Sequence, residues 1–421
     1  MSTVAQAGGA DSHKEKVGYG FIFMYTLAFF GLWLALLTPV IISIALRIEA
    51  LDPANKEANL SFVLGIGAIA AMVINPIAGY FSDRTPGRFG KRRPWLILGS
   101  VVALVGLYMM AVGDLTTLFI GLLITQAGYN AVLAAITAVL PDQVPEEQRG
   151  VVSGILGICL PVAVLAGIKL TEMANGDVFN MFMWPGYVAL GTIILFCIIL
   201  KDDVLVPGTM PKQSLVDFVK GFWISPRIAP DFTWAFVSRF LVFIGIAVLI
   251  TYQVFYMIDV LKIAPDDIPG YMVTAMLWTT VTTVVGSLLA GWASDYFNRR
   301  KIFVWLSAAL CAVSLIQIGY ATTFDAFLWG MAINGLGQGI YLAVDLALVT
   351  DVLPNPEDAA KDLGIFNIAS AMPQSLAPAI APTILAIGAV NGQSNYAALF
   401  LASGIFSILG AIAVFMIKKA R

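Results

Sequence analysis

The sequence Gly79-Tyr-Phe-Ser-Asp-Arg-Thr-Pro-Gly-Arg-Phe-Gly-Lys-Arg-Arg-Pro-Trp95 places five cations and one carboxylate between two long apolar runs. Charge of this density cannot enter the hydrocarbon of a membrane, so the segment is predicted to be a short loop at a membrane face. Because loops rich in Arg and Lys stay on the cytoplasmic side, that face is predicted to be cytoplasmic.

A reduced copy of this loop occurs in the second half of the chain. It reads Gly291-Trp-Ala-Ser-Asp-Tyr-Phe-Asn-Arg-Arg-Lys301, so that Gly79 and Asp83 are each matched 212 residues later. A second pair of segments, 139–150 and 352–364, is offset by 213 to 214 residues. Two motifs in the same order at nearly one offset indicate a duplication, and the chain is predicted to consist of two parallel halves.

The composition is that of a polytopic membrane protein. Of the 421 residues 59% are hydrophobic and only 12% are charged, and the mean hydropathy is +0.87, which exceeds what a soluble core needs. The net charge of −2 gives no basis for a nucleic-acid partner. Cys159, Cys197 and Cys311 lie in apolar runs without metal-ligand spacing, and the only histidine is His13 in the polar amino-terminal tail. We therefore expect packing cysteines, and no metal or other cofactor apart from a coupling ion.

The apolar runs predict an all-α membrane protein with 12 transmembrane helices in two pseudo-symmetric six-helix bundles. About 20 apolar residues cross the hydrocarbon of a bilayer, and twelve runs reach that length. They cover approximately residues 19–47, 60–82, 95–112, 116–140, 150–171, 184–200, 232–261, 269–292, 302–320, 325–350, 363–388 and 396–417.

The domain limits and the orientation follow from these spans. We predict a tail at 1–18, bundles at 19–200 and 232–417, a linker at 201–231 and a tail at 418–421. Of the 24 Lys and Arg residues, 19 fall in the tails and even-numbered loops, so both termini are predicted to be cytoplasmic in a plasma or bacterial inner membrane. We expect a monomer.

The charged loop after the helix predicted over 60–82 also carries a family resemblance. Gly79-Tyr-Phe-Ser-Asp83-Arg84 and Gly87-Arg88-Phe-Gly90-Lys-Arg-Arg-Pro-Trp95, set between halves of six helices, resemble the signature loop of the major facilitator superfamily. The Arg-Phe-Gly-Lys-Arg-Arg-Pro run and Leu37-Thr-Pro39 resemble the sucrose and glycoside-pentoside-hexuronide cation-symporter branches. The resemblance implies a secondary transporter, not an enzyme, whose halves rock about a central site.

In that family the loop takes part in gating. Asp83 ends a helix, where its charge opposes the negative end of the helix dipole, so we expect an Arg or another helix's amino terminus to hold it in a contact that breaks when the halves move. A loop that only anchors the topology is the alternative. The predicted gating residues are Gly79, Asp83, Arg84, Gly87, Arg88, Gly90, Arg92, Arg93, Gly291, Asp295, Arg299 and Arg300.

Two charges fall inside predicted spans at equal depth. Arg239 lies about seven residues from one end of its helix and Asp345 about six from the end of another, so at 1.5 Å per residue both lie about 10 Å deep. Intramembrane charges are costly, and we predict a coupling ion pair that a proton or substrate disrupts. A static pair, or an Arg239 that reaches the headgroups, is the alternative.

The cation required for coupling is predicted to be a proton. The melibiose-type carriers that the branch resemblance suggests hold their cation with carboxylates in the second and fourth helices, whereas the helices predicted over 60–82 and 116–140 offer Asn75, Gln126 and Asn130. Asp345 is then the only deeply placed carboxylate, and H+ coupling would use it.

Neutral polar and aromatic side chains dominate the predicted cavity helices. Such groups suit a polyhydroxylated neutral ligand better than an anion, although any one of them could equally bridge two helices. The predicted substrate-cavity residues are Trp33, Asn75, Gln126, Asn130, Gln253, Tyr256, Trp278, Asn334, Gln338, Tyr341, Asn367 and Gln374.

These features predict proton-coupled import of a neutral sugar or glycoside by alternating access. An exporter of amphipathic drugs or metabolites fits the same fold. A membrane enzyme would need a nucleophile with a base, or a metal cluster, and the spans contain no histidine, HExxH or GxSxG. A transport-like sensor would need a signalling domain, for which the polar segments are too short.

Overall fold

The computed structural model describes residues 16–86, 88–202, 229–297, 299–352, 359–389 and 394–417. Most of the predicted linker, residues 1–15 of the amino-terminal tail and the whole carboxy-terminal tail therefore lie outside the described residues. The helices are α1 (Tyr19–Thr38), the π-helical segment η1 (Pro39–Ser43), α2 (Ile44–Leu51), the 3-10 turn η2 (Pro53–Asn55), α3 (Lys56–Asp83), α4 (Arg93–Val112), α5 (Leu115–Gln143), α6 (Glu146–Met173), α7 (Val178–Ile199), α9 (Pro230–Asp259), α10 (Ile268–Phe297), α11 (Arg300–Gly319), α12 (Phe324–Val352), α13 (Ala359–Leu385) and α14 (Tyr396–Phe415).

The predicted all-helical membrane architecture is confirmed. Within the described residues, eleven helical segments are long and apolar enough to cross a membrane, with α1, η1 and α2 forming one of them. α13 is the twelfth long helix, and it contains Pro373, Pro378 and Pro382. The three cysteines are buried and unpaired, as expected for packing residues.

Some helices start earlier than the apolar runs do. α7 begins at Val178, six residues before the predicted start, because the Asp177 side chain accepts a hydrogen bond from the backbone N–H of Asn180. In the same way Asp52 accepts from the N–H of Asn55 in the turn that leads into α3. Polar caps add turns to a helix beyond its apolar segment.

The helices form two groups with the same internal packing. In the first group α1 packs against α6 and α7, α4 against α5 and α7, and α3 against α5. In the second group α9 packs against α13 and α14, α11 against α12 and α14, and α10 against α12. Each contact in one group thus has its counterpart in the other, as a duplicated six-helix unit requires.

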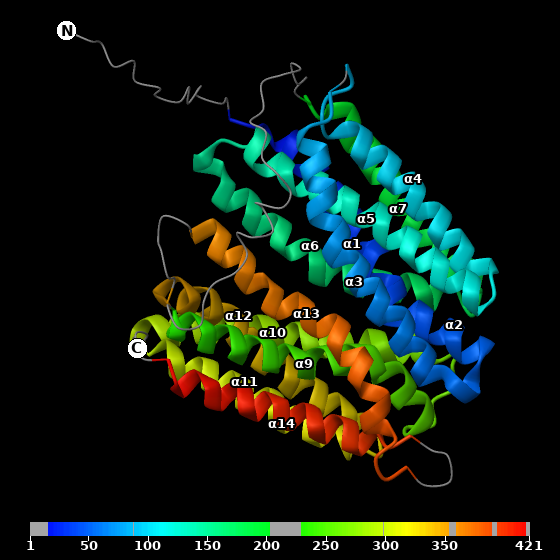
Figure 1. Ribbon diagram of the computed structural model, residues 1–421, viewed down its shortest axis with the longest axis vertical. Helices are drawn as coiled ribbons and strands as arrows, with labels where there is room; N and C mark the ends of the chain where they lie inside the picture. The colour runs from blue at the N-terminus through cyan, green and yellow to red at the C-terminus, as the bar shows by residue number, and fades with distance from the viewer. Residues whose placement is uncertain are drawn as a thin grey trace.

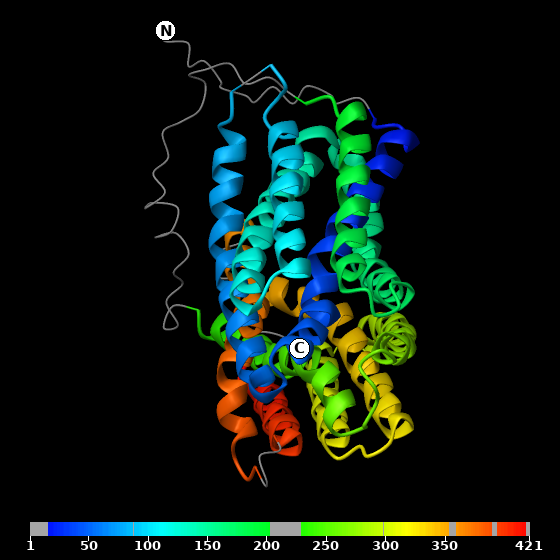
Figure 2. The same ribbon diagram turned by 90° about the vertical axis from the view of Figure 1, so that its right-hand side faces the viewer.

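The two groups meet through equivalent helices, α3 with α13 and α6 with α10. Figure 2 shows the first group, blue to green, above the second. In Figure 1 the groups lie close together near α2 and spread apart toward the other end of the helices. We call the end that carries residues 84–92 the loop face and the end that carries residues 49–57 the opposite face. The 28 residues of α3 separate these faces by about 42 Å.

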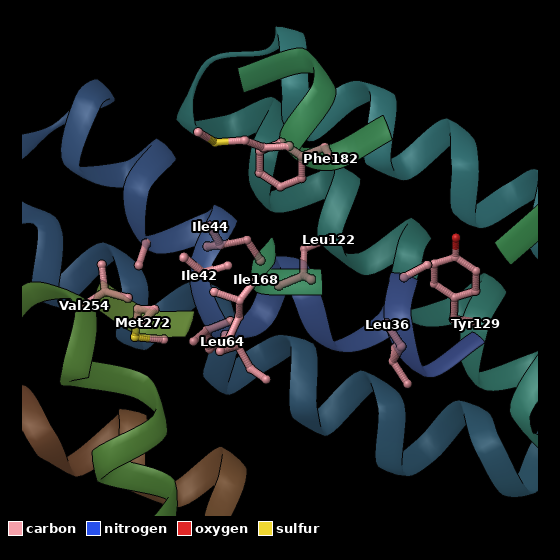
Figure 3. Packing of buried hydrophobic residues seen from close by; sticks show 14 of the residues in the cluster. Leu36, Ile42, Ile44, Leu64, Leu122, Tyr129, Ile168, Phe182, Val254 and Met272 are labelled. Atoms are coloured by element: carbon pink, nitrogen blue, oxygen red, sulfur yellow. The ribbon is translucent and has the colours of Figure 1, made fainter. Parts of the chain in front are cut away.

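An apolar seam joins the two groups toward the opposite face. Val254 of α9 and Met272 of α10 lie in one buried cluster with Ile42 and Leu64 of the first group, and Figure 3 shows these side chains close together. All four are at most 7% exposed. The seam therefore joins the two groups at this end by hydrophobic packing.

Glycines let α10 and α12 approach closely. A Cβ added to Gly335 or Gly339 of α12 would overlap backbone atoms of Thr279 or Thr283 in α10. These two glycines therefore allow the backbones of α10 and α12 to pack directly on each other. Gly150 and Gly154 of α6 have the same spacing but make no such contact, because no atom of the described residues lies within 4 Å of a Cβ built at either position.

Candidate functional site

The charged loop is held together by Arg92. Its guanidinium lies 2.5 Å from Asp83 Oδ1 at the end of α3 and 2.9 Å from Asp142 Oδ2 near the end of α5, and it donates to Ser82 Oγ at 3.0 Å. Arg92 is only 4% exposed, so its charge is compensated inside the protein. Lys91 adds a second ion pair to Asp142 at 3.0 Å. Asp83 thus has an Arg partner, but that partner belongs to its own loop and not to the other half.

Asp202 caps the start of α4 from the far end of α7. Its Oδ2 accepts hydrogen bonds from the backbone N–H groups of Arg92 and Arg93, at 2.6 and 2.8 Å. The Arg93 guanidinium also donates to the carbonyl of Leu200. Gly90 has φ +86°, and a Cβ there would overlap Asp202, so only glycine fits this turn.

The other predicted gating residues differ in their surroundings. Arg84 stacks 3.6 Å from the ring centre of Tyr80, and Arg88 is exposed beside Phe89. Gly87 and the side chain of Asp295 lie outside the described residues. Gly79 and Gly291 are half-buried, and in the second-half copy Arg299 is exposed while Arg300 opens α11.

The structure brings Arg239 and Asp345 together in the second group. They form a direct ion pair between α9 and α12, with side chains 14% and 8% exposed. Arg239 also donates to Ser370 Oγ of α13 at 3.3 Å, and the Tyr341 hydroxyl hydrogen-bonds to Asp345. Arg239 lies nine residues from the start of α9 and Asp345 seven from the end of α12, about 14 and 11 Å from the loop face.

The first-group amides lie on neighbouring helices. On α5 the buried Asn130 side chain donates to Gln126 Oε1 at 2.9 Å. Asn75 of α3 donates to the carbonyl of Asn130 at 3.4 Å. The structure thus gathers three of the predicted cavity residues into one polar cluster between α3 and α5.

Three predicted cavity residues bond to groups on their own or a neighbouring helix, as in the helix-bridging alternative that the sequence left open. The Tyr256 hydroxyl is fully buried and bonds to the carbonyls of Ile318 and Ala321, which ties α9 to the end of α11. Asn334 of α12 is fully buried and donates to Ser314 Oγ of α11 at 2.8 Å, while Gln338 donates to Asn334 at 2.5 Å. These polar groups satisfy one another, as buried polar groups must.

The remaining predicted cavity residues are dispersed. Trp33 is half-buried and packs edge-to-face on Phe29, whereas Trp278 on α10 and Gln374 on α13 are exposed. The Asn367 side chain lies outside the described residues. Gln253 of α9 is fully buried, and its Oε1 has no hydrogen-bond partner within the part of the chain that the structure describes.

The sequence reasoning missed several charged residues that the fold brings together. Asp142 lies in the repeated segment 139–150, and this repeat could have marked it as a candidate residue. No sequence pattern marks Asp202. At the opposite face a cluster joins the two groups. Its residues are Glu49, Lys56, Glu57, Asp259 and Tyr396. Of these only Lys56 entered the sequence analysis, in the count of Lys and Arg, because nothing in the sequence pairs residues about 200 positions apart.

Comparison with known proteins agrees with this architecture. The chain belongs to the Major Facilitator Superfamily, which it matches over residues 19–280 and 235–421. It is therefore a secondary transporter that moves a small molecule across a membrane. This family consists of transporters and not of enzymes.

Relatives of known function transport different compounds. The chain is 24% identical over 429 residues to the cis,cis-muconate transport protein of Acinetobacter baylyi, covering 97% of this chain and 96% of that protein. It is 23% identical over 190 residues to the general alpha-glucoside permease of Schizosaccharomyces pombe, a match that spans only 32% of that protein. A stretch of 72 residues is 36% identical to a sucrose transport protein of Oryza sativa and covers 12% of it.

Solved structures share the fold at low sequence identity. The nucleoside transporter NupG superposes with a TM-score of 0.72 at 13% identity, covering 95% of this chain and all of that chain. The xylose transporter XylE from E. coli, in a partially occluded inward open conformation, gives a TM-score of 0.66 at 15% identity, with 93% and 97% covered.

Proposed function

We propose that the protein imports a neutral sugar or glycoside together with a proton by alternating access. The proposal of proton coupling rests on the position of Asp345. It is a buried carboxylate inside a membrane helix and is shared by Arg239 and Tyr341. Protonation of Asp345 would release Arg239, which keeps its contact with Ser370. Such a carboxylate-guanidinium pair suits a site that alternates between two charge states.

Neutral hydrogen-bonding groups support a sugar as the substrate. Gln253 offers a buried carbonyl oxygen that has no hydrogen-bond partner among the described residues. The amides of Asn75, Gln126 and Asn130 form a neutral cluster on the other half. Sugar hydroxyls both donate and accept, and so complement amides. The partial relatives named for alpha-glucosides and sucrose support the same class.

We propose that the loop face is cytoplasmic, in a plasma or bacterial inner membrane, with the substrate site open to that side. The segregation of Lys and Arg into the tails and even-numbered loops supports this orientation. The apolar seam supports closure at the other side.

A second candidate substrate is an organic carboxylate. The muconate relative matches nearly the whole chain, and Arg239 would be the cation for such a ligand. An anion would have to compete with Asp345 for that guanidinium, whereas a sugar would not.

Counterflow in proteoliposomes tests these proposals. Vesicles would be preloaded with a disaccharide, a dicarboxylate or a lipophilic cation and supplied with the labelled compound, with and without an inward proton gradient. We expect disaccharide exchange, together with accumulation only when the gradient is present. Exchange of the dicarboxylate or the lipophilic cation alone would overturn the sugar assignment.

Asp345→Asn separates coupling from binding in the same vesicles. The amide keeps the size of the side chain but cannot titrate, so exchange should persist while gradient-driven accumulation is lost. Lys169→Ala, which removes an exposed cation that pairs with Glu172 on its own helix, is the control. Accumulation in D345N equal to that of the unaltered protein would contradict coupling through Asp345.

A further inference from the structure

An apolar cavity of about 370 Å³ lies beside the charged loop, between α4 and α5. Thr85 and Trp95 form its end at the loop face, and Leu98, Val102 and Ala127 are among the residues along its length. From Trp95 to Val102 it follows α4 for about 10 Å. Leu98 is 66% exposed, and α4 lies at the outer edge of the first group (Figure 1). The cavity therefore reaches the outer surface of a membrane span, where lipid lies.

The cavity exists because small residues meet where α4 and α5 cross. A Cβ added to Gly99 would lie 2.8 Å from the carbonyl oxygen of Gly128, and one added to Gly128 would lie 2.4 Å from the carbonyl oxygen of Gly99. The backbones are thus in direct contact. Ala127 and Ala131, beside this crossing on α5, offer one methyl group each. No long side chain from α5 fills the space next to the crossing.

The lining of the cavity offers no free polar side chain to water. Among the residues that line it, Thr85 and Trp95 carry the polar side-chain groups, and these bond to each other, with Trp95 Nε1 donating to Thr85 Oγ1 at 2.7 Å. The Thr85 hydroxyl donates in turn to the carbonyl of Phe81 at 2.8 Å. Apolar cavities without hydrogen-bonding groups exclude water and accept apolar guests. The occupant that fits is therefore a hydrocarbon chain.

Two cations of the loop lie next to this end of the cavity without a carboxylate partner. Lys91 and Arg92 form ion pairs with carboxylates of α3 and α5. No carboxylate of the described residues lies within ion-pair distance of Arg84 or Arg88, and both guanidiniums lie over aromatic rings instead. They are one residue before and three residues after Thr85. Guanidinium groups bind phosphate oxygens strongly, so this charge complements an anionic headgroup.

We propose that the cavity binds an acyl chain of an anionic phospholipid, and that Arg84 and Arg88 bind the phosphate of the same lipid at the loop face. The chain fills the space that the small residues leave, and the headgroup supplies the negative charge that the two guanidiniums lack. A zwitterionic lipid offers the same chain without net charge and binds more weakly. The site lies within the first group, so the inference goes beyond the proposed transport function and does not depend on it.

Fluorescence quenching by brominated lipids tests the site, because Trp95 lines the cavity. Full-length protein would be reconstituted in phosphatidylcholine that contains increasing fractions of chain-brominated phosphatidylglycerol or chain-brominated phosphatidylcholine. The chain has nine tryptophans, so the signal of Trp95 is the difference between each protein and its Trp95→Phe counterpart. Each cation near an anionic headgroup is worth on the order of fivefold in binding, so half-maximal quenching should need a mole fraction about 10- to 30-fold lower for phosphatidylglycerol.

Variants assign the effect to the cations and to the cavity. Arg84→Gln combined with Arg88→Gln should remove the preference for phosphatidylglycerol, whereas Lys169→Gln, an exposed cation at the opposite face, should keep it. Ala127→Phe, which places a ring in the cavity, should abolish quenching of Trp95 at low mole fraction. Val105→Phe enlarges a 51% exposed residue of α4 outside the cavity and is the matched control.

The outcomes separate a built site from ordinary solvation by the bilayer. Equal half-maximal mole fractions for the two lipids in the unaltered protein would mean contact with bulk lipid alone and would overturn the site. A preference that survives in R84Q/R88Q would overturn binding of the phosphate by these arginines, and tight quenching that survives in A127F would overturn the cavity as the place of the chain. If A127F fails to fold, the arginine variant still decides. No substrate or gradient is present, so a failure of sugar transport or of proton coupling leaves this result readable.

Discussion

At the scale of single residues, Arg92 decides the shape of the charged loop. It is one buried guanidinium held by the carboxylates of two helices, and its own backbone N–H is bound by Asp202. Three helix ends therefore converge on one residue of the loop. The gating role predicted for this loop stays a prediction, since its partners here all belong to one half.

Removal of Arg92 should cost far more than removal of an exposed cation. Arg92→Ala leaves Asp83 and Asp142 facing each other without their main cation, and we expect a loss of about 3 kcal/mol in the free energy of unfolding. Thermal unfolding in detergent measures this loss. Lys169→Ala is the comparison, for which we expect a loss of only about 0 to 1 kcal/mol. Equal losses for the two variants would show that the loop pairs are only surface contacts.

The Arg239 pair allows a double-variant test. Arg239→Met keeps the length packed beside Phe243 and Phe366 but leaves Asp345 as a buried unpaired charge, for an expected loss of about 3 to 5 kcal/mol. Adding Asp345→Asn should recover much of that loss. Unfolding of the two single variants and the double variant gives the coupling energy. Strictly additive losses would mean that the two side chains do not stabilise each other.

Residue identity predicted some of the candidate site and not the rest. Arg239 and Asp345 could be matched by depth, because a charge inside a membrane span needs a partner. Tyr256 and Asn334 could not be placed, since a polar side chain on a buried helix faces either a cavity or a neighbouring helix, and the sequence does not record which. Contacts between distant segments, such as Lys56 with Asp259, depend on the assembled fold.

At the scale of helices, substitution of glycines can test the close approach of α12 to α10. Gly339→Ala would push a methyl group into the Thr283 backbone, and we expect a loss of about 1 to 3 kcal/mol. Gly154→Ala, where nothing lies within 4 Å, should be neutral or stabilising by up to about 1 kcal/mol, because Ala favours helix. Thermal unfolding of the two variants decides, and a stabilised G339A would contradict the packing of α10 on α12.

Helix positions followed from apolar length, whereas helix ends did not. The twelve runs correspond to the twelve long helices because the cost of exposing backbone to lipid forces each run into a helix. Their ends depend on caps such as Asp177, which lie in the polar sequence outside the run. The π-helical segment at Pro39–Ser43 could not be predicted, because proline is compatible with several backbone geometries in a membrane helix.

At the scale of the whole molecule, the repeat in the sequence predicted the two equivalent groups. The residue limits of the bundles and the linker stay predictions, since most of the linker lies outside the described residues. The spread of the halves in Figure 1 could not be predicted, because a transporter sequence must be compatible with more than one arrangement of its halves.

Orientation is testable with thiol reagents. Arg88→Cys at the loop face and Ala54→Cys at the opposite face are both exposed, whereas Cys159, Cys197 and Cys311 are buried and should react slowly. In intact cells an impermeant maleimide should label A54C, and R88C only after permeabilisation. The reverse pattern would invert the orientation proposed from the distribution of cations.

The π-helical turn η1 between α1 and α2 would allow α2 to rotate about the helix axis relative to α1. The N–H of Ile44 bonds to the carbonyl of Pro39 five residues earlier, so this turn holds one residue more than an α-helical turn. Each residue of an α-helix advances by about 100° around the axis. Conversion of this π-helical turn to α-helical geometry would therefore rotate the outer end of the crossing by roughly that angle. Such a twist would swing Glu49 away from Lys56 while the rest of the bundle stayed still.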